Sequence, residues 1–418
     1  MAFPPSLRGP RGHIALVAAL SVAALIAPTG AAWASSGLTA AEATLPANSA
    51  PIPQADLNSV SCISPVQCVA VGRYQSNDGG HALIITKDTT WGLARSALLP
   101  ADALGTANAV LNGVSCVSWG NCVAVGQYET AAGFEGLIET ERGGIWKYPV
   151  RSPLPSDNVG SSVTSLNSVS CVAINHCVAV GQYTNAAGNQ AFIAWQAAGV
   201  WDRATRSPLP RRAKSNFITQ LDGVSCTSWG YCVAVGQYVN SAPARRGMIV
   251  TEAAGVWNKA VGAQLPTNSH ANPWAGLFSV RCVSLGNCVA VGVYEGPSHG
   301  QGLIIGESHG VWGRGLVAPL PAGFAPGAYA SQLLSVSCVS VGNCTAVGQF
   351  TAGQIDRGVL ISEIKGGWGN PTLTPQPSNA VSPYFEALNG VSCVTTHCSM
   401  VGQYQAQLGQ PAEIISTG

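Results

Sequence analysis

The chain has 418 residues, of which 47% are hydrophobic and only 9% are charged, and its formal net charge at pH 7 is +1. So small a charge gives no long-range field to hold nucleic acid or an anionic membrane, which excludes a nucleic-acid-binding protein. The apolar content, with many Val, Ile and Trp residues, excludes a disordered chain and indicates a large packed core.

The N-terminal segment, 1–34, has the order of a secretory signal peptide. Arg8 and Arg11 precede an apolar run over 14–26, and a stretch of small residues ends at Ala34. This order predicts cleavage after Ala34 and export of the remaining chain. The apolar run is shorter than the roughly 20 residues of a membrane helix, which favours a signal peptide. No later segment is long and apolar enough to span a membrane, so we expect no membrane span in the mature part. An uncleaved N-terminal anchor is the alternative.

Seven cysteine pairs recur at nearly even spacing along the remaining chain, 35–418. Their period of about 55 residues predicts a single domain of seven repeats. An even number of cysteines in an exported chain predicts disulfides. The pairs are Cys62 and Cys68, Cys116 and Cys122, Cys171 and Cys177, Cys226 and Cys232, Cys282 and Cys288, Cys338 and Cys344, and Cys393 and Cys398.

Each complete repeat contains four short β-segments separated by turn residues. In the second repeat we expect strands over 111–117, 122–128, 136–140 and 145–150, with a three-residue turn at 118–120 and a second tight turn at 142–144. A four-stranded antiparallel meander repeated seven times is typical of an all-β, seven-bladed β-propeller.

The last repeat ends before its fourth strand, and the missing strand is found near the N-terminus. Six repeats contain a Trp followed at a fixed interval by a Pro, as in Trp146 and Pro155, and this Pro precedes the next cysteine pair by a nearly constant distance. Pro46 stands in the same relation to Cys62, although no complete repeat precedes it. We therefore expect residues 38–45 to supply the fourth strand of the last blade and close the ring, which removes exposed sheet edges. An open solenoid is the alternative.

Each cysteine pair flanks a tight hairpin, so its two members face one another across antiparallel strands. We expect a disulfide inside every blade, with a tighter hairpin in the seventh because that pair is one residue closer. Zinc is the competing explanation, but it needs four converging ligands and each repeat supplies two. The sequence contains no other metal-ligand spacing, and we expect no cofactor.

The turn between the third and fourth strands resembles the Asp-box (BNR) turn of sialidase-type propellers. It reads Glu141-Arg-Gly-Gly144-Ile-Trp146 in the second repeat and has an acid, a Gly and a Trp in that order, with Glu in place of Asp and no leading Ser. The ring closure resembles that of WD40 propellers. Both resemblances imply the fold only. A sialidase active site needs three arginines, a Tyr–Glu pair and an Asp, and no such set can be identified, so we predict no catalytic residue.

Binding residues are expected on the loops that vary between repeats, because the rest of each repeat is nearly identical. These are the loop between the second and third strands and the loop that leads to the next blade. Arg211, Arg212, Arg245 and Arg246 form the densest cationic group there, and Trp274 offers a stacking surface. Other aromatic residues on these loops are Phe134, Phe217, Phe324, Tyr329, Tyr384 and Phe385. Solvated loops with incidental aromatics are the alternative.

The sequence therefore predicts an extracellular or cell-envelope, monomeric, non-enzymatic recognition module that binds a protein or a carbohydrate. A glycosidase-like or lyase-like propeller enzyme and a structural cell-envelope protein are the alternatives.

Overall fold

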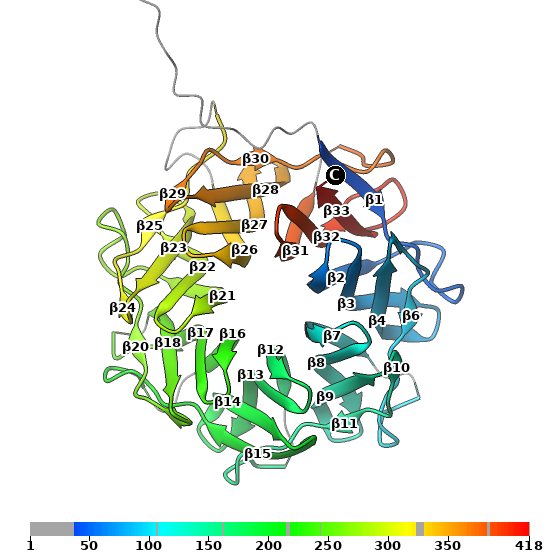
Figure 1. Cartoon of the computed structure of the whole chain (residues 1–418), viewed down its shortest axis with the longest axis horizontal. Coiled ribbons are helices and arrows are strands. Elements are labelled where there is room, and N and C mark those ends of the chain that lie inside the picture. Colours follow the sequence, from blue (N-terminus) through cyan, green and yellow to red (C-terminus); the bar gives the residue numbers. More distant parts are fainter. Residues whose placement is uncertain are drawn as a thin grey trace, which may run out of the picture. The chain divides into compact units, whose positions relative to one another are not determined.

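The computed structural model describes residues 37–105, 108–160, 163–214, 218–242, 244–322, 330–382 and 385–417. These residues contain no α-helix and form seven antiparallel sheets around a central opening (Figure 1). The protein is a seven-bladed β-propeller, as the sequence predicts. The expected signal peptide, residues 1–34, lies outside the described residues.

The blades are numbered here by the order of their cysteine pairs, and the strands of a blade from the innermost, first, to the outermost, fourth. The first strands are β2 (Ala55–Ser64), β7 (Ala109–Ser118), β12 (Ser165–Ala173), β16 (Thr219–Ser228), β21 (Ala275–Ser284), β26 (Ala330–Ser340) and β31 (Glu386–Val394). The second strands are β3 (Gln67–Ser76), β8 (Asn121–Thr130), β13 (His176–Asn185), β17 (Tyr231–Val239), β22 (Asn287–Glu295), β27 (Asn343–Ala352) and β32 (His397–Tyr404). The third strands are β4 (Gly79–Asp88), β9 (Gly133–Arg142), β14 (Gly188–Ala197), β18 (Arg245–Ala253), β23 (Gly300–Ser308), β28 (Ile355–Ile364) and β33 (Ala412–Thr417).

The fourth strand is interrupted in five blades, where the sequence predicts one continuous strand. It consists of β5 (Thr90–Trp91) and β6 (Arg95–Ser96), β10 (Ile145–Trp146) and β11 (Val150–Arg151), β19 (Val256–Trp257) and β20 (Val261–Gly262), β24 (Val311–Trp312) and β25 (Leu316–Val317), and β29 (Gly367–Trp368) and β30 (Thr372–Leu373). Both pieces pair with the same third strand. In blade 3 the fourth strand, β15 (Val200–Arg206), runs unbroken through a bulge.

The ring closes through the N-terminal segment, as predicted. β1 (Leu38–Glu42) pairs antiparallel with β33, from Leu38 opposite Thr417 to Glu42 opposite Glu413. The strand ends at Glu42, before the predicted limit at Leu45. Blade 7 therefore has four strands, three from the C-terminal end of the chain and one from the N-terminal end.

All seven disulfides form inside their own blades, and the Cα–Cα distance is 4.0 Å in each. The hairpin differs from the prediction in one detail. In blade 2, Ser118 pairs with Asn121, so the turn has two residues, Trp119 and Gly120, and the additional residue is a bulge between Cys116 and Ser118.

The seventh hairpin is shorter for a different reason from the one predicted. Val394 pairs with His397 next to the Cys393–Cys398 pair, so the turn again has two residues. The bulge present in the other six blades is missing there. A bulge is where a strand most easily gains or loses one residue, because the flanking ladder is unchanged.

The core lies between neighbouring blades, and each sheet is apolar on both faces. Between blades 1 and 2, for example, Val71 and Ile84 pack against Leu111 and Leu137. Gly126 of β8 permits close approach of the first strand, because a Cβ atom there would lie 1.9 Å from the carbonyl oxygen of Val110. Stacked two-faced sheets explain the continuous apolar second strands in the sequence.

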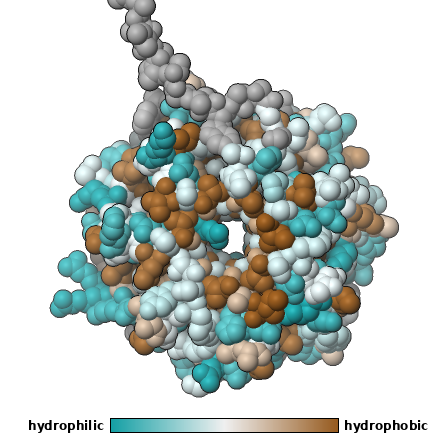
Figure 2. All heavy atoms as spheres, viewed as in Figure 1, coloured by the Kyte–Doolittle hydropathy of each residue, from teal (hydrophilic) through white to brown (hydrophobic). Residues whose placement is uncertain are grey.

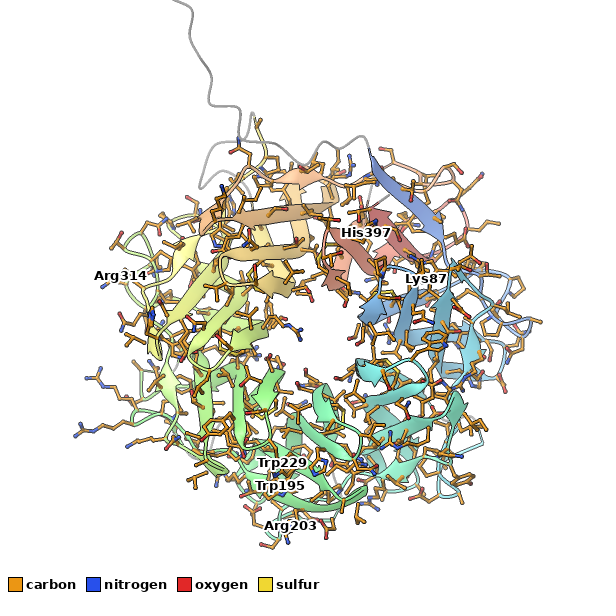
Figure 3. The ribbon with its side chains drawn as sticks, in the orientation of Figure 1. Lys87, Trp195, Arg203, Trp229, Arg314 and His397 are labelled. Atoms are coloured by element: carbon orange, nitrogen blue, oxygen red, sulfur yellow. A yellow bond between two sulfur atoms is a disulfide. The ribbon has the colours of Figure 1, made fainter. Side chains whose placement is uncertain are left out.

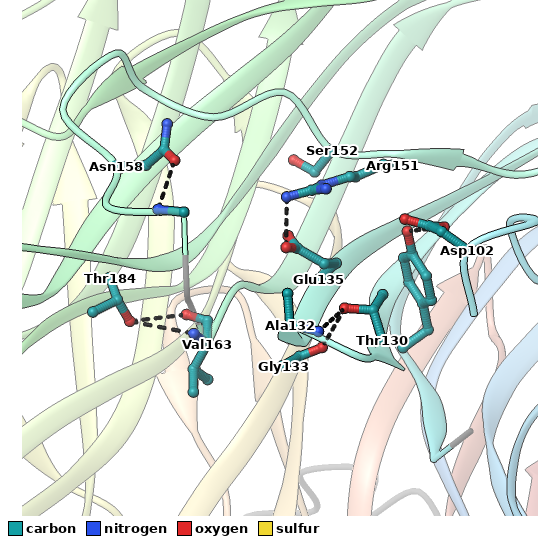
Figure 4. Close-up of polar contacts among 12 residues, drawn as sticks. Asp102, Thr130, Ala132, Gly133, Glu135, Arg151, Ser152, Asn158, Val163 and Thr184 are labelled. Atoms are coloured by element: carbon teal, nitrogen blue, oxygen red, sulfur yellow. Dashed lines mark hydrogen bonds and ion pairs between the residues drawn. The ribbon is translucent and has the colours of Figure 1, made fainter. Parts of the chain in front are cut away.

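The face that carries the variable loops is held by polar contacts. In blade 2, Thr130 Oγ1 donates to the carbonyl oxygen of Gly133 at 2.9 Å, and Arg151 pairs with the buried Glu135 at 2.5 Å (Figure 4). Each of five repeat tyrosines also donates its hydroxyl to an Asn or Asp of the preceding inter-blade loop. The pairs are Tyr74–Asn48, Tyr128–Asp102, Tyr183–Asp157, Tyr294–Asn268 and Tyr404–Asn379.

Candidate functional site

The four arginines predicted to contact a ligand lie on two adjoining loops of blade 4. Arg211 and Arg212 lie on the loop that enters the blade, and Arg245 and Arg246 begin β18. The two loops are joined where Ser241 N donates to the carbonyl oxygen of Arg212 at 3.1 Å. The structure therefore places the predicted residues on one face.

Arg246 already forms hydrogen bonds within the protein. Its guanidinium donates to the carbonyl oxygen of Pro273 and, at 2.8 Å, to Asn272 Oδ1, next to the half-buried Trp274. Arg211, Arg212 and Arg245 are exposed and form no ion pair within the described ranges.

Arg212 occupies the position that holds the tyrosine-binding Asn or Asp in five other blades. Burial raises the pKa of Tyr238, and the charges of Arg246 and Arg212 lower it, so both guanidinium groups lie near that hydroxyl. The loops thus present a cationic surface. Ligand contact by Arg211, Arg212, Arg245, Arg246 and Trp274 stays a prediction. Phe217, Phe324, Tyr329 and Tyr384 lie outside the described residues.

A polar hollow of about 350 Å³ lies on the same face and is lined by residues of blades 7, 1 and 2. It contains the predicted aromatic residue Phe134 together with Asp56 and Arg73, whose side chains pair at 2.8 Å. Most of its other side chains are Gln or Asn amides. The Asp56–Arg73 pair was not predicted, although Arg73 stands where four of the other repeats have Gln in the sequence Val-Gly-Gln-Tyr.

A second hollow was not predicted, and it lies at the opposite end of the blades, where the cysteine hairpins turn. It has a volume of about 380 Å³ between blades 3 and 4. Three tryptophans line it, Trp195, Trp229 and Trp257, together with Arg203 and Glu252. Figure 3 shows Trp195 and Trp229 close together, with Arg203 farther from the centre of the ring. We call this site the tryptophan hollow.

Trp195 is the residue that makes this sector different from the others. It lies on β14 opposite Val178. The other six blades have a small residue at this register position, namely Thr86, Thr140, Thr251, Gly306, Ser362 and Ser416. An alignment of the seven repeats position by position would reveal this exception. A search of the variable loops misses it, because Trp195 lies on a strand.

Trp229 and Trp257 come from blade 4. Trp229 lies in the two-residue hairpin turn and is 44% exposed, and the ring of His176 meets its ring edge-on at 5.0 Å between centroids. Trp257 belongs to the repeat and pairs in register with Glu252. The aromatic surface is therefore held by two adjacent blades and a neighbouring histidine.

Two polar groups accompany the tryptophans. The Arg203 side chain is 68% exposed and lies 3.9 Å from Asp202. Glu252 is buried, one of its oxygens has no hydrogen-bond partner, and burial raises its pKa. The same residue also lines a larger adjoining hollow of about 660 Å³ between blades 4 and 5, together with Tyr231 and Trp312.

Glu252 is one of a repeated set of glutamates that includes Glu141, Glu307 and Glu363. Burial raises the pKa of each of them. A property shared by several blades arises from the repeat and does not identify one catalytic acid. The described residues contain no group of three or more His, Cys, Asp or Glu able to hold a metal ion. No helix in the described part of the chain is long and apolar enough to cross a membrane.

No protein-family model and none of the curated proteins matches the chain. Among solved structures, a Dyadobacter fermentans protein of unknown function is 8% identical over 91% of this chain and 100% of that chain, with a TM-score of 0.46. Trypanosoma rangeli sialidase is 11% identical over 91% of this chain and 59% of its own, with a TM-score of 0.44. Penicillium chrysogenum α-L-arabinanase complexed with arabinobiose is 10% identical over 74% of this chain and 93% of its own, with a TM-score of 0.43. Likeness at this level carries no information on activity or ligand.

Proposed function

We propose that this protein is an extracellular, non-catalytic glycan-binding propeller and that the tryptophan hollow is its sugar-binding site. The observation that carries the proposal is Trp195, a large aromatic side chain at a position where every other blade has Thr, Ser or Gly. The seven intrablade disulfides favour an oxidising, extracellular location.

The hollow has the chemistry that a sugar ring needs. The C–H face of a pyranose is apolar and packs on an indole ring, and its hydroxyl groups require a few well-placed polar partners. Trp195, Trp229 and Trp257 supply the apolar walls, while Arg203 donates hydrogen bonds and Glu252 has an oxygen without a partner. The volume of about 380 Å³ lies within the range of small-molecule sites, roughly 300–1,000 Å³.

Binding without catalysis fits the charges better than a glycosidase does. Glycoside hydrolysis normally uses two carboxyl groups on either side of the scissile bond. Glu252 is the one carboxylate among the described residues that line the tryptophan hollow. A purely structural role in the cell envelope, in contrast, does not explain why Trp195 replaces the small residue of the other blades and lines a hollow.

A glycan array followed by titration of the best-bound glycan tests the proposal, with tryptophan fluorescence as the readout. Trp195→Thr restores the residue of three other blades, so it should fold normally. We expect at least about a ten-fold loss of affinity, the equivalent of roughly 1.4 kcal/mol of lost stacking and burial.

Trp119→Ala is the matched control. Trp119 holds the equivalent hairpin position to Trp229 in blade 2 and is 38% exposed, but it does not line the hollow. It should leave affinity unchanged. An equal loss in both variants, or no glycan bound by the wild type, would contradict the proposal. Release of reducing sugar from the bound glycan would replace it with the glycosidase alternative.

A further inference from the structure

The seven first strands line a polar channel of about 390 Å³ along the propeller axis. Figure 2 shows its mouth open at the centre of the ring. The channel wall has largely the same residues in every blade. A blade that has a different residue therefore makes one side of the channel chemically distinct and a candidate binding site.

A belt of serines joins the blades around this channel. The serine before the first cysteine of a blade accepts a hydrogen bond from the backbone N–H of the first cysteine in the next blade. Six such bonds are present among the described residues, each at 3.0 Å, namely Ser61–Cys116, Ser115–Cys171, Ser170–Cys226, Ser225–Cys282, Ser337–Cys393 and Ser392–Cys62.

The belt is interrupted at blade 5, where Arg281 replaces the serine. The Cys338 N–H of the next blade therefore lacks a serine acceptor. Arg281 lines the channel, is exposed to it, and forms no ion pair with any described residue. The surrounding strands partly exclude water from the guanidinium group in the channel, and this desolvation lowers the pKa of Arg281.

The hydroxyl groups of the belt serines are hydrogen-bond donors for which the described residues provide no acceptor. Each belt serine uses its oxygen as an acceptor, and its hydroxyl hydrogen has no acceptor within the described ranges. The one carboxylate among the described residues of the channel wall is Asp222. It lies three residues along the strand from the belt position and accepts a hydrogen bond from Gln220 at 2.7 Å. Burial raises the pKa of Asp222 to about 7, so this group is largely uncharged in mildly acidic solution.

We propose that the channel binds a small oxyanion, held by the Arg281 guanidinium with the serine hydroxyls and the Cys338 N–H. An oxyanion accepts several hydrogen bonds at once, and Arg binds two of its oxygens in a planar fork. This site is separate from the tryptophan hollow and does not depend on the function proposed for it.

Isothermal titration calorimetry with sodium sulfate at pH 6 and constant ionic strength tests the site. Sulfate is suitable because its charge does not change near this pH. Arg281→Ser restores the residue of the other six blades and supplies an acceptor for Cys338, so it should fold at least as well as the wild type. We expect saturable binding by the wild type and at least about a ten-fold loss in Arg281→Ser, since a hydrogen bond to a charged group contributes roughly that factor. Arg281→Lys should retain part of the affinity.

Arg314→Ser is the matched control, because Arg314 is an exposed arginine at the outer edge of the ring (Figure 3). It should bind sulfate as the wild type does. Equal affinities in wild type and Arg281→Ser, or no saturable binding by the wild type, would overturn the proposal. Titration with glucuronate in place of sulfate decides the source of the anion: tighter binding identifies a carboxylate carried by a sugar, and weaker binding identifies a free inorganic anion.

Discussion

Glu413 of β33 occupies an apolar core position, and replacing it with leucine should stabilise the protein. It pairs with Gly402. The residues at this register position in the other blades are all apolar, namely Leu83, Leu137, Phe192, Met248, Leu303 and Val359. Glu413 is fully buried, and neither of its carboxyl oxygens has a hydrogen-bond partner.

The surroundings of Glu413 explain its protonation state. Burial raises its pKa well above the usual value, the nearby carboxylate of Glu386 raises it further, and Arg357 lowers it. Arg357 already pairs with Glu386 at 3.2 Å. Thr374 Oγ1 also donates to Glu386 at 2.5 Å. Glu413 is therefore the member of the pair that keeps its proton, and it is a buried polar group without a partner.

The magnitude follows from two favourable contributions and one cost. Burying a leucine side chain contributes about 1.5–3 kcal/mol. Removing an unsatisfied buried polar group contributes about 1–3 kcal/mol more, and repacking around the larger side chain costs about 1–2 kcal/mol. We expect Glu413→Leu to increase the free energy of unfolding by about 2–4 kcal/mol at neutral pH.

The pH dependence gives a second readout. Because the folded-state pKa of Glu413 lies above that of the unfolded chain, wild-type stability falls as pH rises above about 4 and through the folded-state pKa. Guanidinium denaturation at pH 5 and pH 8 measures both effects. Glu413→Leu should gain more at pH 8 than at pH 5, and Glu413→Gln should remove the part of the pH dependence that Glu413 contributes while gaining less. A lower stability of Glu413→Leu at both pH values would refute the reasoning.

Three further predictions concern other parts of the ring. Burial raises the pKa of Asp222 to about 7, so its carboxyl destabilises the fold as pH rises from about 4 to 7. Asp222→Asn should stabilise by up to about 4 kcal/mol at pH 8 and little at pH 4 in urea denaturation, and an equal effect at both pH values would contradict this. Deleting residues 38–46 should expose the edge of β33 and cause aggregation or a lower Tm in size-exclusion chromatography and thermal melts; a variant that melts like the parent would show that closure by β1 is dispensable. Replacing all four blade 4 arginines, Arg211, Arg212, Arg245 and Arg246, with serine should weaken binding to a sulfated polysaccharide and reduce the salt dependence of that binding. Unchanged affinity would count against the arginine site.

The sequence by itself determined the architecture, because every feature that specifies a blade lies within one repeat. The cysteine spacing, the hairpin turns and the apolar second strand are local patterns, and local pairing fixes their register. Ring closure was also readable, because Pro46 shows that the N-terminal segment belongs to the repeat pattern. The bulge that separates Cys116 from the two-residue turn could not be predicted, because a bulge and a longer turn contain the same number of residues.

Only the tertiary structure decided which side chains meet between blades. Trp195 and Trp229 line one hollow, and Arg357 of blade 6 pairs with Glu386 of blade 7, because the faces of neighbouring blades pack on one another. Arg281 faces a channel that exists only when seven first strands surround one axis. Sequence separation carries no information about these contacts, since the distance between such groups depends on how the sheets stack. A repeat-breaking residue is visible in the sequence, but its chemical surroundings come from the packing of the blades.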